Sequence, residues 1–115
     1  MEDICKKELI IYDMLNEYKF YVLQENGFVN VTKICNDYNV NFETWKNEFY
    51  EPLHKEYLGL IELCSLQQRD PIIYYHDSVY LEISLAFHFI YWVSLKLGLG
   101  FCANIIPFLC EYFKE

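Results

Sequence analysis

The alternation of apolar and polar positions predicts short helices and strands that follow one another along the chain. Residues 3–15 place their apolar side chains at near-helical spacing, which favours a short N-terminal helix. The next two apolar runs, YKFYVL and FVNV, are aromatic and β-branched, and Asn26-Gly27 lies between them. This pair is typical of a type I′ turn, in which both central residues have positive φ, so we expect a first β-hairpin near 18–31.

Two short helices are expected after this hairpin. Asn30 is a good N-cap, and apolar residues follow it at helical intervals as far as Tyr38. After a loop of about three residues, Asn41 can cap a second helix over FETWKNEFYE, whose apolar side chains form one stripe. Two short helices joined in this way are the helix-turn-helix pattern.

The middle of the chain predicts a second hairpin. LIELCSL and IIYY are interpreted as its strands, near 60–75, although a helix through residue 65 competes with this interpretation. Asp77 is then expected to cap the longest helix, over about 78–93.

The apolar C-terminal part raises the question of a membrane span. Residues 83–110 hold a single charge, Lys96, which divides them into pieces of 13 and 14 residues. Both pieces are shorter than the roughly 20 residues that a span needs. We therefore expect no membrane but two buried helices, with 83–93 as the most buried segment and a last helix over about 100–113 that bends at Pro107.

The composition fits one small domain over residues 1–115. The chain is 54% hydrophobic and 19% aromatic, which provides enough apolar material for a core and excludes disorder. The five cysteines form no CxxC pair, and the charged start MEDICKKE does not resemble a signal peptide. We therefore expect free thiols and an intracellular protein.

The patterns of common enzyme and metal sites are missing from the sequence. His54, His76 and His88 are too widely spaced for a zinc motif, and no GxSxG, P-loop or GxGxxG is present. His88 lies in an apolar run and is interpreted as a core histidine with a hydrogen-bond partner. We expect no enzyme activity, no cofactor and no structural metal.

Two blocks of the sequence resemble a known family of DNA-binding domains. The first block is GFVNVTKIC (27–35), followed by Phe42 and Trp45; the second runs from Tyr75-His76 through Leu81, Leu85, Trp92 and Ser94. Together they resemble the KilA-N domain of phages and large eukaryotic DNA viruses, a relative of the fungal APSES domain, over about 18–113. The resemblance implies a small α+β domain that is winged-helix-like, a helix-turn-helix with two β-hairpins, and that binds DNA in an infected cell.

The resemblance and the expected helix positions together give a set of candidate DNA contacts. Three lie at the start of the first short helix, three on the exposed side of the second, and one at a hairpin tip: Asn30, Thr32 and Lys33; Thr44, Lys46 and Asn47; Arg69. Each also has a simpler explanation, since Asn30 can be only a cap and Lys33 only a solvated lysine. Trp45 is interpreted as a core residue.

The charge of the chain leaves two functional hypotheses open. The net charge is −8, and residues 18–47 carry three lysines and three acidic residues, hence zero. DNA-binding domains are normally basic on one face. One hypothesis is therefore a stand-alone viral domain that binds nucleic acid weakly. The alternative is an acidic protein-interaction module on the same scaffold, a viral inhibitor or adaptor of a host factor that has lost DNA binding. Association into a homo-oligomer stays open in both hypotheses.

Overall fold

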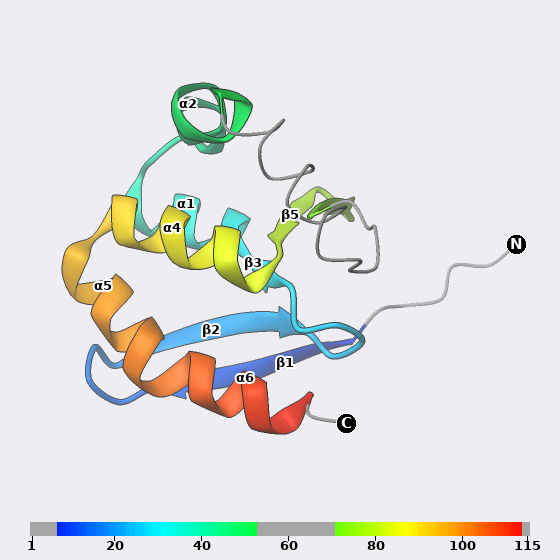
Figure 1. The fold of residues 1–115 in the computed structure, drawn as a ribbon, viewed down its shortest axis with the longest axis vertical. Coiled ribbons are helices and arrows are strands. Elements are labelled where there is room, and N and C mark those ends of the chain that lie inside the picture. Colours follow the sequence, from blue (N-terminus) through cyan, green and yellow to red (C-terminus); the bar gives the residue numbers. More distant parts are fainter. Residues whose placement is uncertain (1–6, 53–70, 114–115) are drawn as a thin grey trace, which may run out of the picture.

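The computed structural model describes residues 7–52 and 71–113. Their strands are β1 (Glu8–Asp13), β2 (Tyr18–Leu23), β3 (Val29–Asn30), β4 (Ile72–Tyr75) and β5 (Ser78–Leu81). Their helical segments are α1 (Val31–Tyr38), α2 (Phe42–Trp45), η1 (Lys46–Tyr50), α4 (Ile83–Val93), α5 (Leu95–Gly100), η2 (Phe101–Ile105) and α6 (Ile106–Tyr112). Because η1 continues α2, and α5, η2 and α6 are continuous, these segments make four helices around one antiparallel sheet (Figure 1). The expected α+β class is confirmed.

The sheet joins all five strands in the order β1-β2-β3-β5-β4. Although β3 has only two residues, it joins the β1–β2 pair to the β4–β5 pair, because Val29 pairs with Val22 of β2 and with Leu81 of β5. The order leaves β1 and β4 at the two edges of the sheet.

The prediction of an N-terminal helix over 3–15 is wrong for the residues that the structure describes, because Glu8–Asp13 form strand β1. Its six residues pair with all of β2, from Glu8 opposite Leu23 to Asp13 opposite Tyr18. The run ELIIYD contains β-branched and aromatic residues that suit a strand, and pairing with β2 outweighs the weak helical spacing.

The first hairpin is confirmed, but its turn is not type I′. Of its two central residues only Gly27 has positive φ, at 81°. The loop is longer than two residues, since the Gly27 amide donates to the Leu23 carbonyl at 2.8 Å and the Leu23 amide to the Phe28 carbonyl. The Asn26 side chain accepts the Phe28 amide instead, as in an Asx turn.

The two-residue turn with both φ values positive occurs in a hairpin that was not expected, between β4 and β5. His76 and Asp77 have φ of 50° and 62°. The strand over 72–75 is confirmed, and the expected partner over 60–66 lies outside the described residues. Asp77 does not cap a helix, because the residues after it pair with β3 and β4 as a strand.

Helix α4 therefore begins only at Ile83, capped by the Glu82 carboxylate, which accepts the Ser84 and Leu85 amides. The helix contributes three fully buried side chains to the core, those of Ala86, Phe89 and Ile90.

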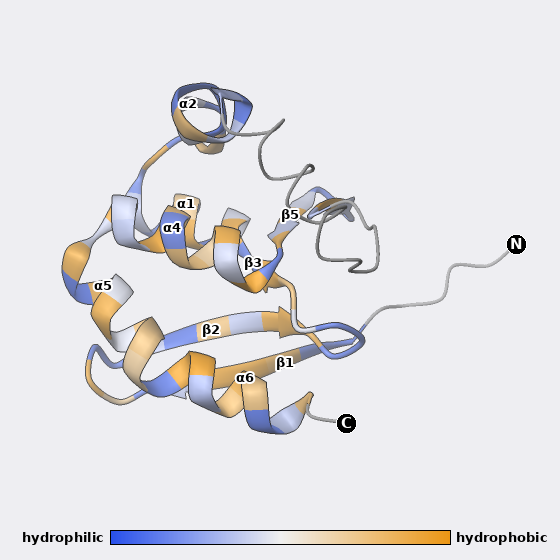
Figure 2. Ribbon diagram, viewed as in Figure 1, coloured by the Kyte–Doolittle hydropathy of each residue, from blue (hydrophilic) through white to orange (hydrophobic). Residues whose placement is uncertain are grey.

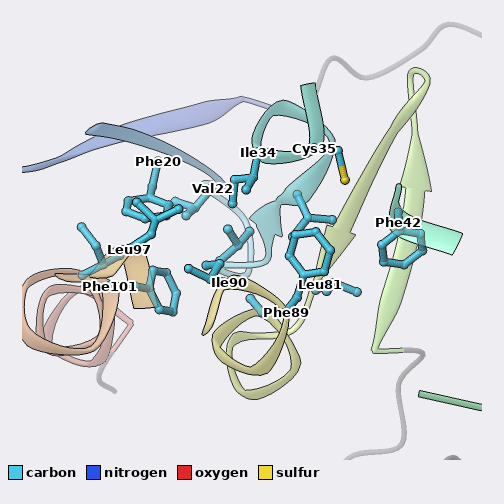
Figure 3. Packing of buried hydrophobic residues seen from close by; sticks show 14 of the residues in the cluster. Phe20, Val22, Ile34, Cys35, Phe42, Leu81, Phe89, Ile90, Leu97 and Phe101 are labelled. Atoms are coloured by element: carbon cyan, nitrogen blue, oxygen red, sulfur yellow. The ribbon is translucent and has the colours of Figure 1, made fainter. Parts of the chain in front are cut away.

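The core is formed by side chains from the sheet and from each of the four described helices (Figure 3). Phe20, Val22 and Leu81 come from strands, and the labelled helical residues are Ile34, Cys35, Phe42, Phe89, Ile90, Leu97 and Phe101. The expectation that 83–93 is the most buried segment is wrong, because Gly27–Val31 is buried at every position, whereas Tyr91 of α4 is exposed. Helix α4 covers the sheet with one side only.

The last helix is longer than expected and begins earlier, at Leu95, where the Ser94 hydroxyl accepts the Leu97 amide. The segment before Pro107 is π-helical. Proline lacks an amide proton and its ring crowds the preceding turn, so the regular α-helical hydrogen bonds are interrupted there. Because the chain breaks at Ser94 and not at Lys96, the continuous helix Leu95–Tyr112 reaches 18 residues. By length and composition alone it could cross a membrane, and 33% of it is buried inside the domain. The absence of a membrane stays a prediction.

Candidate nucleic-acid interface

The start of α1 holds three of the candidate residues, and Asn30 is its N-cap as expected. The Asn30 Oδ1 accepts the Lys33 amide at 3.2 Å, while its Nδ2 donates to Glu8 Oε2 at 2.8 Å. The Tyr80 hydroxyl donates to the same Glu8 oxygen at 2.6 Å. Asn30 is only 2% exposed, so its side chain serves the fold and does not face a ligand.

Thr32 and Lys33 are also engaged within the domain. The Thr32 hydroxyl accepts the Val79 amide at 2.8 Å, which ties the first turn of α1 to β5. The Lys33 ammonium lies 4.7 Å from the centre of the Tyr21 ring, a cation–π contact. Lys33 is half-buried, so it is not the freely solvated lysine of the simpler interpretation.

The second helix begins at Asn41, whose side chain accepts the Glu43 amide at 2.8 Å. Thr44 and Asn47 are both exposed, as expected. The third candidate on this helix, Lys46, is half-buried, and its ammonium lies 3.7 Å from the Glu51 carboxylate. Arg69 lies outside the described residues.

Acidic side chains dominate the exposed side of this second helix. Glu43, Glu48 and Glu51 are all exposed there. Residues 31–51 contain four acidic residues, these three and Asp37, and two lysines. The net charge of this segment is therefore −2. The sequence contained this signal, because the three glutamates lie at positions outside the apolar stripe of FETWKNEFYE.

The buried side of the same helix anchors it to α4. Trp45 is a core residue, as expected, and its indole Nε1–H donates to His88 Nδ1 at 3.0 Å. His88 has the expected hydrogen-bond partner, but it is exposed and not a core residue. It lies on the solvent side of α4, and the hydrogen bond from the Trp45 indole joins it to the edge of the core.

A shallow, open pocket of about 380 Å³ lies where α1 turns into α2. It is lined by Thr32, Cys35, Asn39, Val40, Asn41 and Phe42. Burial raises the pKa of the Cys35 thiol to about 11. The thiol is therefore protonated near neutral pH and is a poor nucleophile.

The described cysteines are free thiols, as expected: Cys35 is buried, whereas Cys102 and Cys110 are exposed. Cys5 and Cys64 lie outside the described residues. Within residues 7–52 and 71–113, no three metal-ligating side chains lie close enough together to hold a metal ion.

Compared with family models, with curated proteins and with solved structures, the chain matches none of them. The resemblance to the KilA-N domain therefore stays a hypothesis that depends on the motif residues alone.

Proposed function

We propose that this chain is a protein-interaction module on a KilA-N-like scaffold, and that it does not bind duplex DNA through α2. The observation that carries this proposal is the acidic exposed side of α2 and η1. In a helix-turn-helix, the second helix lies in the major groove between two phosphate backbones. Glu43, Glu48 and Glu51 would approach those phosphates, and the one lysine among them is already paired with Glu51.

The order of the helices and strands supports the proposed KilA-N-like scaffold. Helix α1 ends at Tyr38, its C-cap Asn39 has the left-handed conformation with φ of 56°, and Asn41 caps the next helix. This short connection is compatible with a helix-turn-helix. The β4–β5 hairpin, with its two-residue turn, would take the place of a wing.

The same surface indicates which kind of partner would bind. Exposed carboxylates on one helical side favour a partner with a basic surface, because opposite charges steer association and suppress wrong partners. In the setting that the resemblance implies, the partner is a host factor in an infected cell, and the chain is its inhibitor or adaptor.

Weak nucleic-acid binding is the second candidate, and one observation favours it. Thr44 and Asn47 are both exposed and lie three residues apart, hence on one side of the helix. Their hydroxyl and amide groups are suitable for base edges. In this candidate the lysines Lys33 and Lys46 would supply the phosphate contacts.

A charge-reversal experiment separates the two candidates. Anisotropy of a labelled DNA duplex is followed at about 20 mM salt, where phosphate contacts are strongest. We expect no binding by the natural chain and salt-dependent binding by Glu43→Lys/Glu48→Lys. The matched control, Glu17→Lys/Glu25→Lys, changes the net charge equally on two loops outside α2 and should not bind.

Binding by the natural chain that is lost in Lys33→Glu would instead establish the second candidate. For the first, a photo-crosslinking residue at Asn47 should trap a basic protein in cells, and the same residue at Glu17 should not. The crosslink should disappear in Glu43→Gln/Glu48→Gln; its persistence there would contradict a role for the acidic side.

A further inference from the structure

Strand β1 lies at an edge of the sheet, and its only strand partner among the described residues is β2. The Gln24 amide donates to the Lys7 carbonyl at 2.9 Å, which continues the β1–β2 register by one pair. In an antiparallel pair, residues that bond to the neighbour alternate with residues that bond away from it. Ile11 therefore bonds toward β2, while Ile10 and Tyr12 direct their amides and carbonyls toward the open edge.

This edge also carries exposed apolar side chains. Ile10 is 57% exposed and Tyr12 is 50% exposed, and both point to the same side of the sheet. Met14 and Leu15, in the turn that follows, are exposed as well. Figure 2 shows β1 as hydrophobic along most of its length.

Most of the usual protections of an edge strand are missing from β1; the exception is Asp13, a buried carboxylate at the end of the strand. Natural edges are kept apart by lysines, prolines, bulges or inward-pointing charges, and Glu8–Asp13 contains no lysine, no proline and no interruption of its register. Its two carboxylates lie at the ends of the strand and are already engaged. Glu8 accepts from Asn30 and Tyr80, and Asp13 accepts from Leu15, Asn16 and Asn104.

We propose that β1 pairs antiparallel with the β1 strand of a second copy of this chain, so that one sheet continues across a symmetric dimer. Outward-directed amides and carbonyls at strand spacing can be satisfied together by another strand. This strand is complementary to itself, because one register sets Ile10 opposite Tyr12 of the second copy and, by symmetry, Tyr12 opposite Ile10. Such aromatic and β-branched pairs are favourable across strands.

Salt dependence distinguishes this contact from nucleic-acid binding. Each copy carries a net charge of −8, so two copies repel each other. Added salt screens that repulsion. Self-association through an apolar edge should therefore strengthen with salt, whereas binding to phosphates weakens. The dimer does not depend on what α2 binds, so it can fail or succeed independently of the proposed function.

The test is sedimentation velocity of the full chain over a range of concentrations and salt. We expect a monomer–dimer equilibrium that shifts toward the dimer at higher salt. Ile10→Lys/Tyr12→Lys keeps the backbone and should be monomeric throughout. Its matched control, Tyr74→Lys/Leu99→Lys, replaces two similarly exposed apolar residues elsewhere with the same change in charge and should still dimerise.

Two further measurements locate the contact. Tyr12→Pro removes an amide that points away from β2, so it should abolish the dimer while the thermal unfolding temperature shows that the fold is kept. Hydrogen exchange followed by NMR should show protection of Ile10 and Tyr12 that rises with concentration, and protection of Ile11 that does not. A natural chain that stays monomeric, including one that uses this edge only for another protein, overturns the proposal. So does a dimer that persists in the lysine pair and in Tyr12→Pro.

Discussion

Asn30 is a position at which a small chemical change should have a large effect on stability. Its side chain joins α1 to β1, because Oδ1 caps the helix and Nδ2 donates to Glu8. Replacing Asn30 with Ala removes the cap, worth about 1 kcal/mol. It also removes a hydrogen bond to a carboxylate, worth about 2 kcal/mol. We therefore expect Asn30→Ala to lower the free energy of unfolding by about 3 kcal/mol.

Asn30→Asp separates these two contributions. The new carboxylate can still cap the helix, since Asp and Asn are equally good caps. It now lies against Glu8, where the amide nitrogen was 2.8 Å away. Two charges at about 4 Å interact by about 4 kcal/mol at an effective dielectric constant of 20. At pH 7 we expect Asn30→Asp to be at least as destabilised as Asn30→Ala.

The loss of unfolding free energy in Asn30→Asp should become smaller as the pH falls. Two carboxylates in contact raise the pKa of one of them, because they cannot both ionise easily. A folded-state pKa above the unfolded one gives stability that is fully present below the unfolded pKa and is lost as pH rises through the folded pKa. The Asp variant should therefore recover toward pH 4, relative to Asn30→Ala at the same pH.

A second substitution should restore the pair at neutral pH. In Glu8→Gln/Asn30→Asp, the amide donor and the carboxylate acceptor exchange places. The Tyr80 hydroxyl, which donates to the same Glu8 oxygen, then faces the nitrogen of the new amide and can accept its second proton. We expect a coupling energy of about 2–3 kcal/mol in the double-mutant cycle. Urea unfolding followed by the fluorescence of the buried Trp45 measures all four variants. Additive effects, or an Asn30→Asp variant as stable as the natural chain, would show that this network does not hold α1 in place.

Three other predictions concern stability. Gly100→Ala should destabilise by about 2–4 kcal/mol in thermal or urea unfolding, although alanine usually favours a helix, because its Cβ would overlap Asp13 and Asn16. Asp77→Gly should raise the free energy of unfolding by about 1 kcal/mol and Asp77→Ala should lower it, because both φ values of the β4–β5 turn are positive; equal effects of the two variants would contradict this. Stability should fall with rising pH above about 9, because burial and hydrogen bonds to Asp37 and Glu8 raise the pKa of Tyr18 and Tyr80, and burial raises that of Cys35 to about 11. The stability that these raised pKa values contribute is fully present below the unfolded pKa and is lost as the pH rises toward the folded pKa. Alkaline urea titrations of Tyr18→Phe should therefore show a shallower loss.

The elements predicted correctly are those with local signals. Asn30 and Asn41 act as N-caps because each places a side-chain oxygen beside the free amides of a first helical turn, a signal within four residues. The strands over YKFYVL and IIYY follow from their residue types.

The two segments expected to be helical that form strands do so for a common reason, which is pairing with neighbouring strands. Residues 8–13 and 78–81 contain β-branched and aromatic residues that suit a strand, and their pairing with β2, β3 and β4 outweighs the helical spacing. A contact between distant positions also involves the Glu8 carboxylate, which lies 22 positions before Asn30 and takes its amide out of reach of a ligand.

The structure also decides which substitutions can test nucleic-acid binding. Removing Asn30 or the Thr32 hydroxyl would loosen α1 from the sheet, because Asn30 contacts β1 and Thr32 contacts β5. A loss of binding in such variants would not identify a DNA contact, since the whole helix would be displaced. Thr44 and Asn47 are exposed, so their substitution leaves the fold intact and reports on the surface alone. If Asn47→Ala changes the preference between duplexes while the thermal unfolding temperature stays constant, base reading by α2 is established despite its glutamates.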